Sequence, residues 1–133
     1  MDWTSLKHFK PEEFGNEEAV SHLDYNLVWL IDEFRDAVGK PFKIHCSWAS
    51  AGHAEKGYHP KGQALDGHFE GLSLKEQFFL ALKFGAFKGI GLYPCWHNPG
   101  LHLDIRKEPL AKIWWQDKAG KYWPINSFLD IPI

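Results

Sequence analysis

The sequence has little cysteine, no long hydrophobic run and no excess of charge of one sign. Its 133 residues include only two cysteines, Cys46 and Cys95, which stand far apart and form no CxxC pair. This spacing excludes a disulfide framework and a zinc knuckle; one bridge between the two is open, and two free thiols are expected. Fifteen Lys and Arg against 17 Asp and Glu give a formal net charge of −2 without a basic stripe, so no nucleic-acid partner is expected.

No segment has the features of a targeting signal or a membrane span. The start, Met1-Asp2-Trp3-Thr4, shows no charged residues followed by an apolar run. Nothing approaches the ~20 consecutive apolar residues of a membrane helix. We therefore expect a soluble protein without a membrane partner, made in the cytoplasm without a signal peptide. To act on a cell wall, the protein would then have to be released from the cell or be part of a virion.

Aromatic side chains, in contrast, are abundant. They make up 16% of the residues, with seven Trp and ten Phe, and the apolar share is 44%. This composition argues against disorder and predicts a dense core with some aromatic surface. A chain of this length can form a core without disulfides, so we expect one domain spanning residues 1–133.

Two helices are indicated by their ends and by apolar spacing. Asn16 is a good N-cap, and apolar residues recur at steps of three and four from Val20 to Val38. This pattern predicts one long helix, which Gly39 ends. A capping box at residues 73–76 predicts a second helix to about residue 84.

Short apolar segments between these helices predict strands. They lie at residues 42–46, 63–69, 88–93 and 101–106. A hairpin is expected around Asp117-Lys118-Ala119-Gly120, and residues 47–62, rich in Gly, Ala, Ser and His, read as a long functional loop. The order of elements predicts an α+β fold, with a mostly antiparallel sheet and helices packed on one of its faces.

Three residues could hold a metal ion: His59, Asp66 and His102. Zinc accepts imidazole nitrogen and carboxylate oxygen, and a catalytic zinc site keeps one position open. In Leu101 to Arg106 (LHLDIR), the two-residue period of a strand puts His102, Asp104 and Arg106 on one face. The spacing alone leaves a purely structural role for the histidines equally open.

Three segments together resemble the motifs of a known family, the zinc D-alanyl-D-alanine carboxypeptidases and L-alanyl-D-glutamate endopeptidases. That family has a Ser-His-x-x-Gly-x-Ala-x-Asp block, a Gly-x-Gly-x-Tyr strand and a strand with His-x-Asp or His-x-His. The matching segments here, in the same order, are residues 58–66, 89–93 and 101–106. Residues 8–14 also resemble the opening of small phage and bacterial members, so the resemblance covers about residues 8 to 106.

The resemblance implies a zinc-peptidase fold, which lysostaphin-type peptidases and the hedgehog signalling domain share. His59, Asp66 and His102 would then hold one Zn²⁺ per chain, which lowers the pKa of a water to about 7. The implied substrate is a peptidoglycan stem peptide with a D-residue at or next to the cleaved bond. With this activity, the protein could be a phage or prophage lysin or a virion-associated protein. Phage structural or lysis proteins would then be its partners. The alternative is an inactive zinc-binding module on the same fold.

The chain departs from the family where a substrate carboxylate is expected to bind. Ala49 stands where many members have an arginine, so another donor would be needed. Arg106 is the candidate, at roughly 13 Å from His102 by strand rise. Trp48 and Trp96 lie in the loops nearest the expected metal and are candidates for shaping the substrate groove, with core packing as the alternative.

A second departure concerns the general base. Many members have an acidic residue three positions before the last ligand, where this chain has Pro99. Asp104 is the candidate catalytic residue; it could take the proton of the water, or instead orient the imidazole of His102. Further candidates from neighbouring segments are His53, Glu55, His68 and His97. Of these, His53 could also approach the metal.

Overall fold

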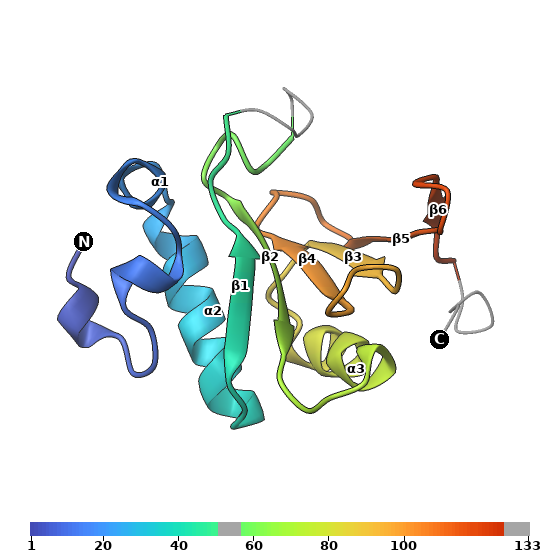
Figure 1. Ribbon diagram of the computed structural model, residues 1–133, viewed down its shortest axis with the longest axis horizontal. Coiled ribbons are helices and arrows are strands. Elements are labelled where there is room, and N and C mark those ends of the chain that lie inside the picture. Colours follow the sequence, from blue (N-terminus) through green and yellow to red (C-terminus); the bar gives the residue numbers. More distant parts are fainter. Residues whose placement is uncertain (51–56, 127–133) are drawn as a thin grey trace.

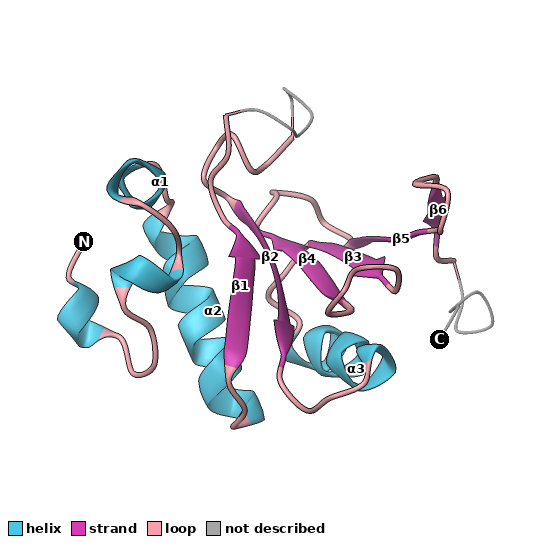
Figure 2. Cartoon of the chain, in the orientation of Figure 1, coloured by secondary structure: helices cyan, strands magenta, loops and turns pink. Residues whose placement is uncertain are grey.

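The structure is a computed structural model, which describes residues 1–50 and 57–126 (Figure 1). Over these residues the chain has an α+β fold with an open, mostly antiparallel six-stranded sheet and three α-helices (Figure 2). The α+β prediction is therefore confirmed. Among the residues described, no helix is both long and apolar enough to cross a bilayer.

The sheet contains the four predicted strands and the predicted hairpin. In spatial order its strands are β1 (Phe42–Cys46), β2 (Ala64–Phe69), β4 (Gly100–Asp104), β3 (Gly89–Tyr93), β5 (Lys112–Gln116) and β6 (Tyr122–Pro124). Neighbouring strands are antiparallel except β3 and β5, which are parallel. The expected extension of β4 to Arg106 is wrong, because the strand ends at Asp104, two residues earlier.

The predicted long N-terminal helix is two helices. They are α1 (Glu17–Ser21) and α2 (Tyr25–Val38), separated by a break at which Asp24 caps α2 by accepting a hydrogen bond from the Asn26 amide. The predicted end at Gly39, in the left-handed conformation, is confirmed. Helix α3 (Leu74–Phe84) begins at the predicted capping box. Two short 3₁₀ helices, Trp3–Ser5 and Pro11–Glu13, precede α1.

The break between α1 and α2 receives the end of the loop that leads into β2. The Asp24 amide donates to the Gly62 carbonyl oxygen at 2.9 Å, and Gln63 Nε2 donates to Asp24 Oδ2 at 3.2 Å. Gly62 has a φ of +69°, and a Cβ at this position would overlap the carbonyl oxygen of His22. In a continuous helix the Asp24 amide would bond to the carbonyl oxygen four residues earlier and could not hold Gly62. The docking fixes the backbone three residues after His59.

The apolar core lies between the sheet and the helices α2 and α3. Leu101 and Leu103 of β4 are fully buried and cluster with Phe34 of α2 and Phe78 of α3. Because successive strand residues point to opposite faces, His102, between the two leucines, points away from this core. The opposite face of the sheet therefore carries the polar side chains of β2 and β4.

Replacing Gly62 tests the docking of the loop. Gly62→Ala should destabilise the protein by about 1–3 kcal/mol more than Gly39→Ala, because both need a positive φ but only Gly62 also meets backbone atoms. Gly39 is the matched control, since nothing lies within 4 Å of a Cβ there. Urea unfolding of both variants measures the difference. Equal losses would contradict the close contact with His22.

Candidate metal centre

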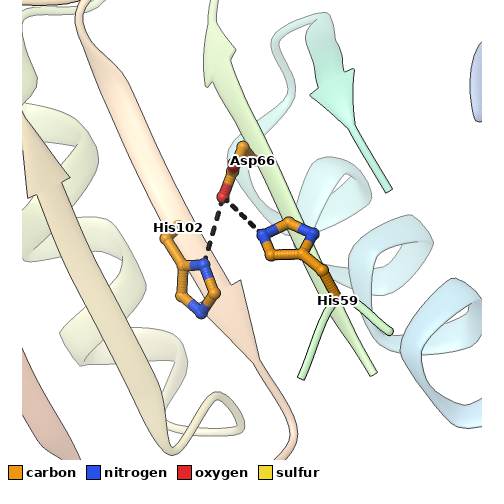
Figure 3. Close-up of side chains that lie close together, drawn as sticks. All are labelled: His59, Asp66 and His102. Atoms are coloured by element: carbon orange, nitrogen blue, oxygen red, sulfur yellow. Dashed lines mark hydrogen bonds and ion pairs between the residues drawn. The ribbon is translucent and has the colours of Figure 1, made fainter. Parts of the chain in front are cut away.

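The three predicted ligands converge on one point of this opposite sheet face (Figure 3). Asp66 of β2 and His102 of β4 are paired residues of neighbouring strands, and His59 comes from the loop before β2. His59, Asp66 and His102 are 4%, 9% and 8% exposed. Their ligand atoms all lie within 4.8 Å of one another. The chain thus has a buried His/Asp/His triad that could bind a metal.

The spacing of the triad suits a small tetrahedral ion. Asp66 Oδ1 lies 3.2 Å from His59 Nε2 and 3.1 Å from His102 Nδ1. Bonds of 2.0–2.1 Å at tetrahedral angles place two ligand atoms about 3.3 Å apart. The two carboxylate–imidazole distances therefore fit a tetrahedral ion, and all the separations within the triad stay within 4.8 Å.

Each imidazole is oriented by a hydrogen bond at the ring nitrogen that does not face the triad. His59 Nδ1 lies 2.6 Å from the Ser47 carbonyl oxygen, which only accepts, so Nδ1 carries the hydrogen and Nε2 faces the triad. His102 Nε2 lies 2.8 Å from Asp104 Oδ2, which leaves Nδ1 for the triad. Such outer partners fix the tautomer and the ring plane of metal-binding histidines.

Asp104 is held on the far side of His102 from the triad. It is fully buried, and Arg106 binds both of its oxygens, with Nε 2.8 Å from Oδ1 and Nη2 2.6 Å from Oδ2. Burial raises the pKa of Asp104, but the bonds from Arg106 and His102 outweigh it and lower the pKa to about 2. This position favours the orienting role for Asp104 over the catalytic-base role.

The prediction that Arg106 continues strand β4 is wrong. Because β4 ends at Asp104, the chain turns and the guanidinium folds back onto that carboxylate. It also lies over the rings of Tyr58 and Trp114, with its Cζ 4.6 Å and 5.3 Å from their centroids. The expected reach of roughly 13 Å from His102 is therefore wrong. Arg106 lines the cavity beside the metal centre, but its Nε and Nη2 are bound to Asp104.

A bulge in β1 brings two more side chains to this face. The register with β2 shifts between Ile44 and Cys46, so that Cys46 lies opposite Asp66, with its Sγ 4.0 Å from His59 Nδ1. The extra residue, His45, places its Nε2 2.6 Å from Nδ1 of His68. Burial, the largest cause, lowers the pKa of both of these histidines.

The charges of the triad stabilise one another. Burial acts to raise the pKa of Asp66, but hydrogen bonds from His102 and His59 hold it well below its usual range. Burial acts to lower the pKa of His59, but Asp66 and its other partners raise it to about 10. The pKa of His102 is raised by the same balance, through Asp104 and Asp66. The carboxylate and the two imidazoles thus favour one another's charged forms.

An open cavity of about 560 Å³ lies directly over the triad. It is lined by Gly57, Tyr58, His59, Asp66, Tyr93, Trp96, His102, Arg106, Trp114, Gln116 and Tyr122. Trp96 is thus one of the residues that line the cavity. Trp48 is not among the lining residues; its ring stacks on His22 at 4.1 Å, and its Nε1 donates to the Pro60 carbonyl oxygen.

Most of the aromatic lining was not predicted from the sequence. Tyr58, Tyr93, Trp114 and Tyr122 come from four segments that only the folded sheet brings together. One signal existed: Gly91 of β3 pairs with Trp114, and a Cβ at Gly91 would lie 2.6 Å from the indole nitrogen. The glycine therefore makes room for the tryptophan.

The remaining candidates for a base lie elsewhere. His97 is exposed and lines a second hollow with His45 and Trp96. His68 faces His45 rather than the triad. His53 and Glu55 lie outside the described residues.

No family model, curated protein or solved structure matches this chain. The resemblance of its motifs therefore stays a prediction.

Zinc binding should release roughly two protons near pH 7, because both imidazoles must become neutral and the pKa of His59 is raised to about 10. The affinity should accordingly rise with pH between 6 and 8, by about tenfold per pH unit for each proton released. Calorimetry in buffers of different ionisation enthalpy counts the protons. A pH-independent affinity without proton release would show that both rings are already neutral.

Asp104→Asn should weaken zinc binding about 10–100-fold, because the amide presents a less basic oxygen to His102 or turns its NH₂ toward the ring. The matched control is Asp32→Asn. Asp32 is equally buried but accepts hydrogen bonds from the amides of Lys7 and His8, far from the triad. A competition titration against a zinc chelator measures both variants. Equal losses in the two would assign the effect to general destabilisation.

Proposed function

We propose that the protein is a zinc-dependent peptidase that cleaves peptidoglycan stem peptides, built as a single domain of the zinc-peptidase fold. One observation carries the proposal: His59, Asp66 and His102 supply two imidazoles and one carboxylate at the floor of an open cavity. Structural zinc sites are closed by four protein ligands, whereas catalytic sites have three and leave one position for water or substrate. This donor set on an open face supports the catalytic type.

The chain's own residues would hold and orient the ion. Ser47 and Asp104 set the planes of the two histidines, and Arg106 holds Asp104 in place with a two-point hydrogen bond. Bound zinc would polarise the peptide carbonyl and activate a water for attack. The ion is therefore the cofactor that the geometry fits, one per chain.

The position of Arg106 favours an endopeptidase over a carboxypeptidase. A carboxypeptidase must bind the terminal carboxylate of its substrate, most strongly through a bidentate arginine. In the part of the chain that the structure describes, Arg106 is the one Lys or Arg side chain lining the cavity, and it is paired with Asp104. Bonds of the L-alanyl-D-glutamate type, within the stem peptide, fit this arrangement better than the terminal D-alanyl-D-alanine bond.

A second candidate is a zinc-binding module without catalysis. Among the described residues that line the cavity, the only carboxylate is Asp66, which the metal would occupy. Asp104, the other nearby acid, is bound by Arg106 and His102. This shortage of a general base specifically favours the inactive module. Release as a phage lysin, or a place in a virion, is proposed from the resemblance of the motifs alone.

Digestion of purified peptidoglycan tests the proposal. The zinc-loaded protein should generate new amino termini, a chelator should stop this, and added zinc should restore it. His59→Ala should abolish both zinc binding and cleavage, because it removes a ligand. His8→Ala is the matched control, since His8 is an exposed histidine paired with Asp36 on another face.

The outcomes separate the two candidates. One zinc per chain with new amino termini supports the peptidase. One zinc per chain without cleavage of any wall preparation supports the inactive module. A protein that stays metal-free after zinc supplementation contradicts both.

A further inference from the structure

The walls of the cavity differ in chemistry from the protein core. Of the ten phenylalanines in the sequence, none among the described residues lines the cavity, and no Leu, Ile or Val side chain does so there either. The aromatic rings at the cavity are Tyr58, Tyr93, Trp96, Trp114 and Tyr122, each with a polar group on its rim. The core, in contrast, is built on phenylalanines and aliphatic residues. The cavity thus offers flat apolar faces that end in hydrogen-bonding groups.

Several of these rings form one connected wall, which we call the aromatic wall: Tyr93, Trp96, Trp114 and Tyr122. Tyr93 and Trp96 stack at 4.3 Å with their planes 15° apart. Trp114 Nε1 donates to the Tyr93 hydroxyl at 3.2 Å, and Tyr122 meets Tyr93 edge-on at 6.5 Å. The rings hold one another, so the wall is formed before a ligand arrives.

Beside the aromatic wall, the charged side chains of the cavity are already paired. Arg106 is neutralised by Asp104, and Asp66 belongs to the metal centre. What remains for recognition is neutral: the rims of the aromatic rings and the amide of Gln116. A ligand for this wall should be uncharged, with one apolar face and hydroxyl or amide groups around its edge.

We propose that the aromatic wall binds the amino sugar to which the stem peptide is attached. A pyranose ring presents C–H groups on its faces and hydroxyl groups at its edge, which matches stacking on Tyr and Trp. The lactyl carboxyl of this sugar is consumed in the amide bond to the peptide, so the sugar unit is uncharged. An aromatic peptide side chain suits the wall less well, because the wall offers it unneeded polar rims and no aliphatic contact.

This inference rests on the proposed function and narrows its substrate. The wall stands beside the triad, since Asp66, His102, Trp96 and Trp114 line the same cavity, and the rings of His102 and Trp114 are 5.1 Å apart. A sugar held there would place the first peptide bonds of the stem near the metal. The substrate class is therefore a glycan-linked peptide rather than a free peptide.

Binding to the metal-free full chain tests the inference without requiring catalysis. The probes are N-acetylmuramyl-L-alanyl-D-isoglutamine, the same dipeptide with an acetyl group on its amino terminus in place of the sugar, and chitotriose, a sugar without a peptide. Both sugar-containing probes should bind saturably in calorimetry or NMR titration. The bare dipeptide should bind at least roughly tenfold more weakly, the difference that one good stacking contact makes.

Variants locate the binding. Trp96→Ala and Tyr122→Ala should each weaken chitotriose binding by about tenfold. Tyr122 lies on the β6 edge strand and is 58% exposed, so its loss should leave the fold intact. Trp29→Ala is the matched control, because Trp29 is a 41% exposed tryptophan of helix α2, outside the cavity.

Each outcome decides something. Equal binding of the bare dipeptide, no binding of chitotriose, or equal losses in Trp29→Ala and Trp96→Ala would overturn the inference. Sugar binding without cleavage of any wall would sustain the aromatic wall as a sugar site and refute the peptidase. Cleavage without sugar binding would support the peptidase and refute the aromatic wall as a sugar site.

Discussion

The interaction on which the site depends is the double hydrogen bond to Asp66 Oδ1, from His59 and from His102. A buried carboxylate is costly unless it is paired, and here two imidazoles meet the same oxygen. Each imidazole is in turn tied to the fold, one to a loop carbonyl and one to a buried ion pair. The pairing of β2 with β4 supplies two of the three members, and the loop before β2 supplies the third. Sheet register, loop docking and buried charge therefore all set the position of one oxygen atom.

Local signals in the sequence predicted most of the elements. The N-caps, the glycine at the end of α2 and the capping box of α3 act within a few residues, so they can be read in order along the chain. The break before α2 could not be read in the same way. Apolar spacing runs through it, and the reason for it, the carbonyl of Gly62 bound to the Asp24 amide, lies 38 residues away (62 − 24).

In the site, too, the features that depend on contacts between distant segments were not predicted. His59, Asp66 and His102 were expected together because the resemblance of three motifs to a zinc-peptidase family implied them as ligands; their spacing alone left a structural role for the histidines equally open. The pairing of Arg106 with Asp104 was missed, because the strand was expected to continue past Asp104 and hold Arg106 at a distance. The aromatic wall was missed for a different reason. It depends on β5 lying parallel to β3, a pairing of distant segments for which Gly91, beside Trp114, is the one signal in the sequence.

The docking of Gly62 at the break between α1 and α2 has a consequence for how tightly an ion is kept. Asp66 and His102 sit on adjacent central strands and can separate only when the sheet opens. His59 instead depends on the docking of Gly62 at Asp24, so undocking there is the local opening that would free a bound ion from its third ligand. A ligand that binds only the closed form stabilises that form by mass action. The residence time of the ion and the protection of the loop amides against hydrogen exchange are then two readings of the same local opening.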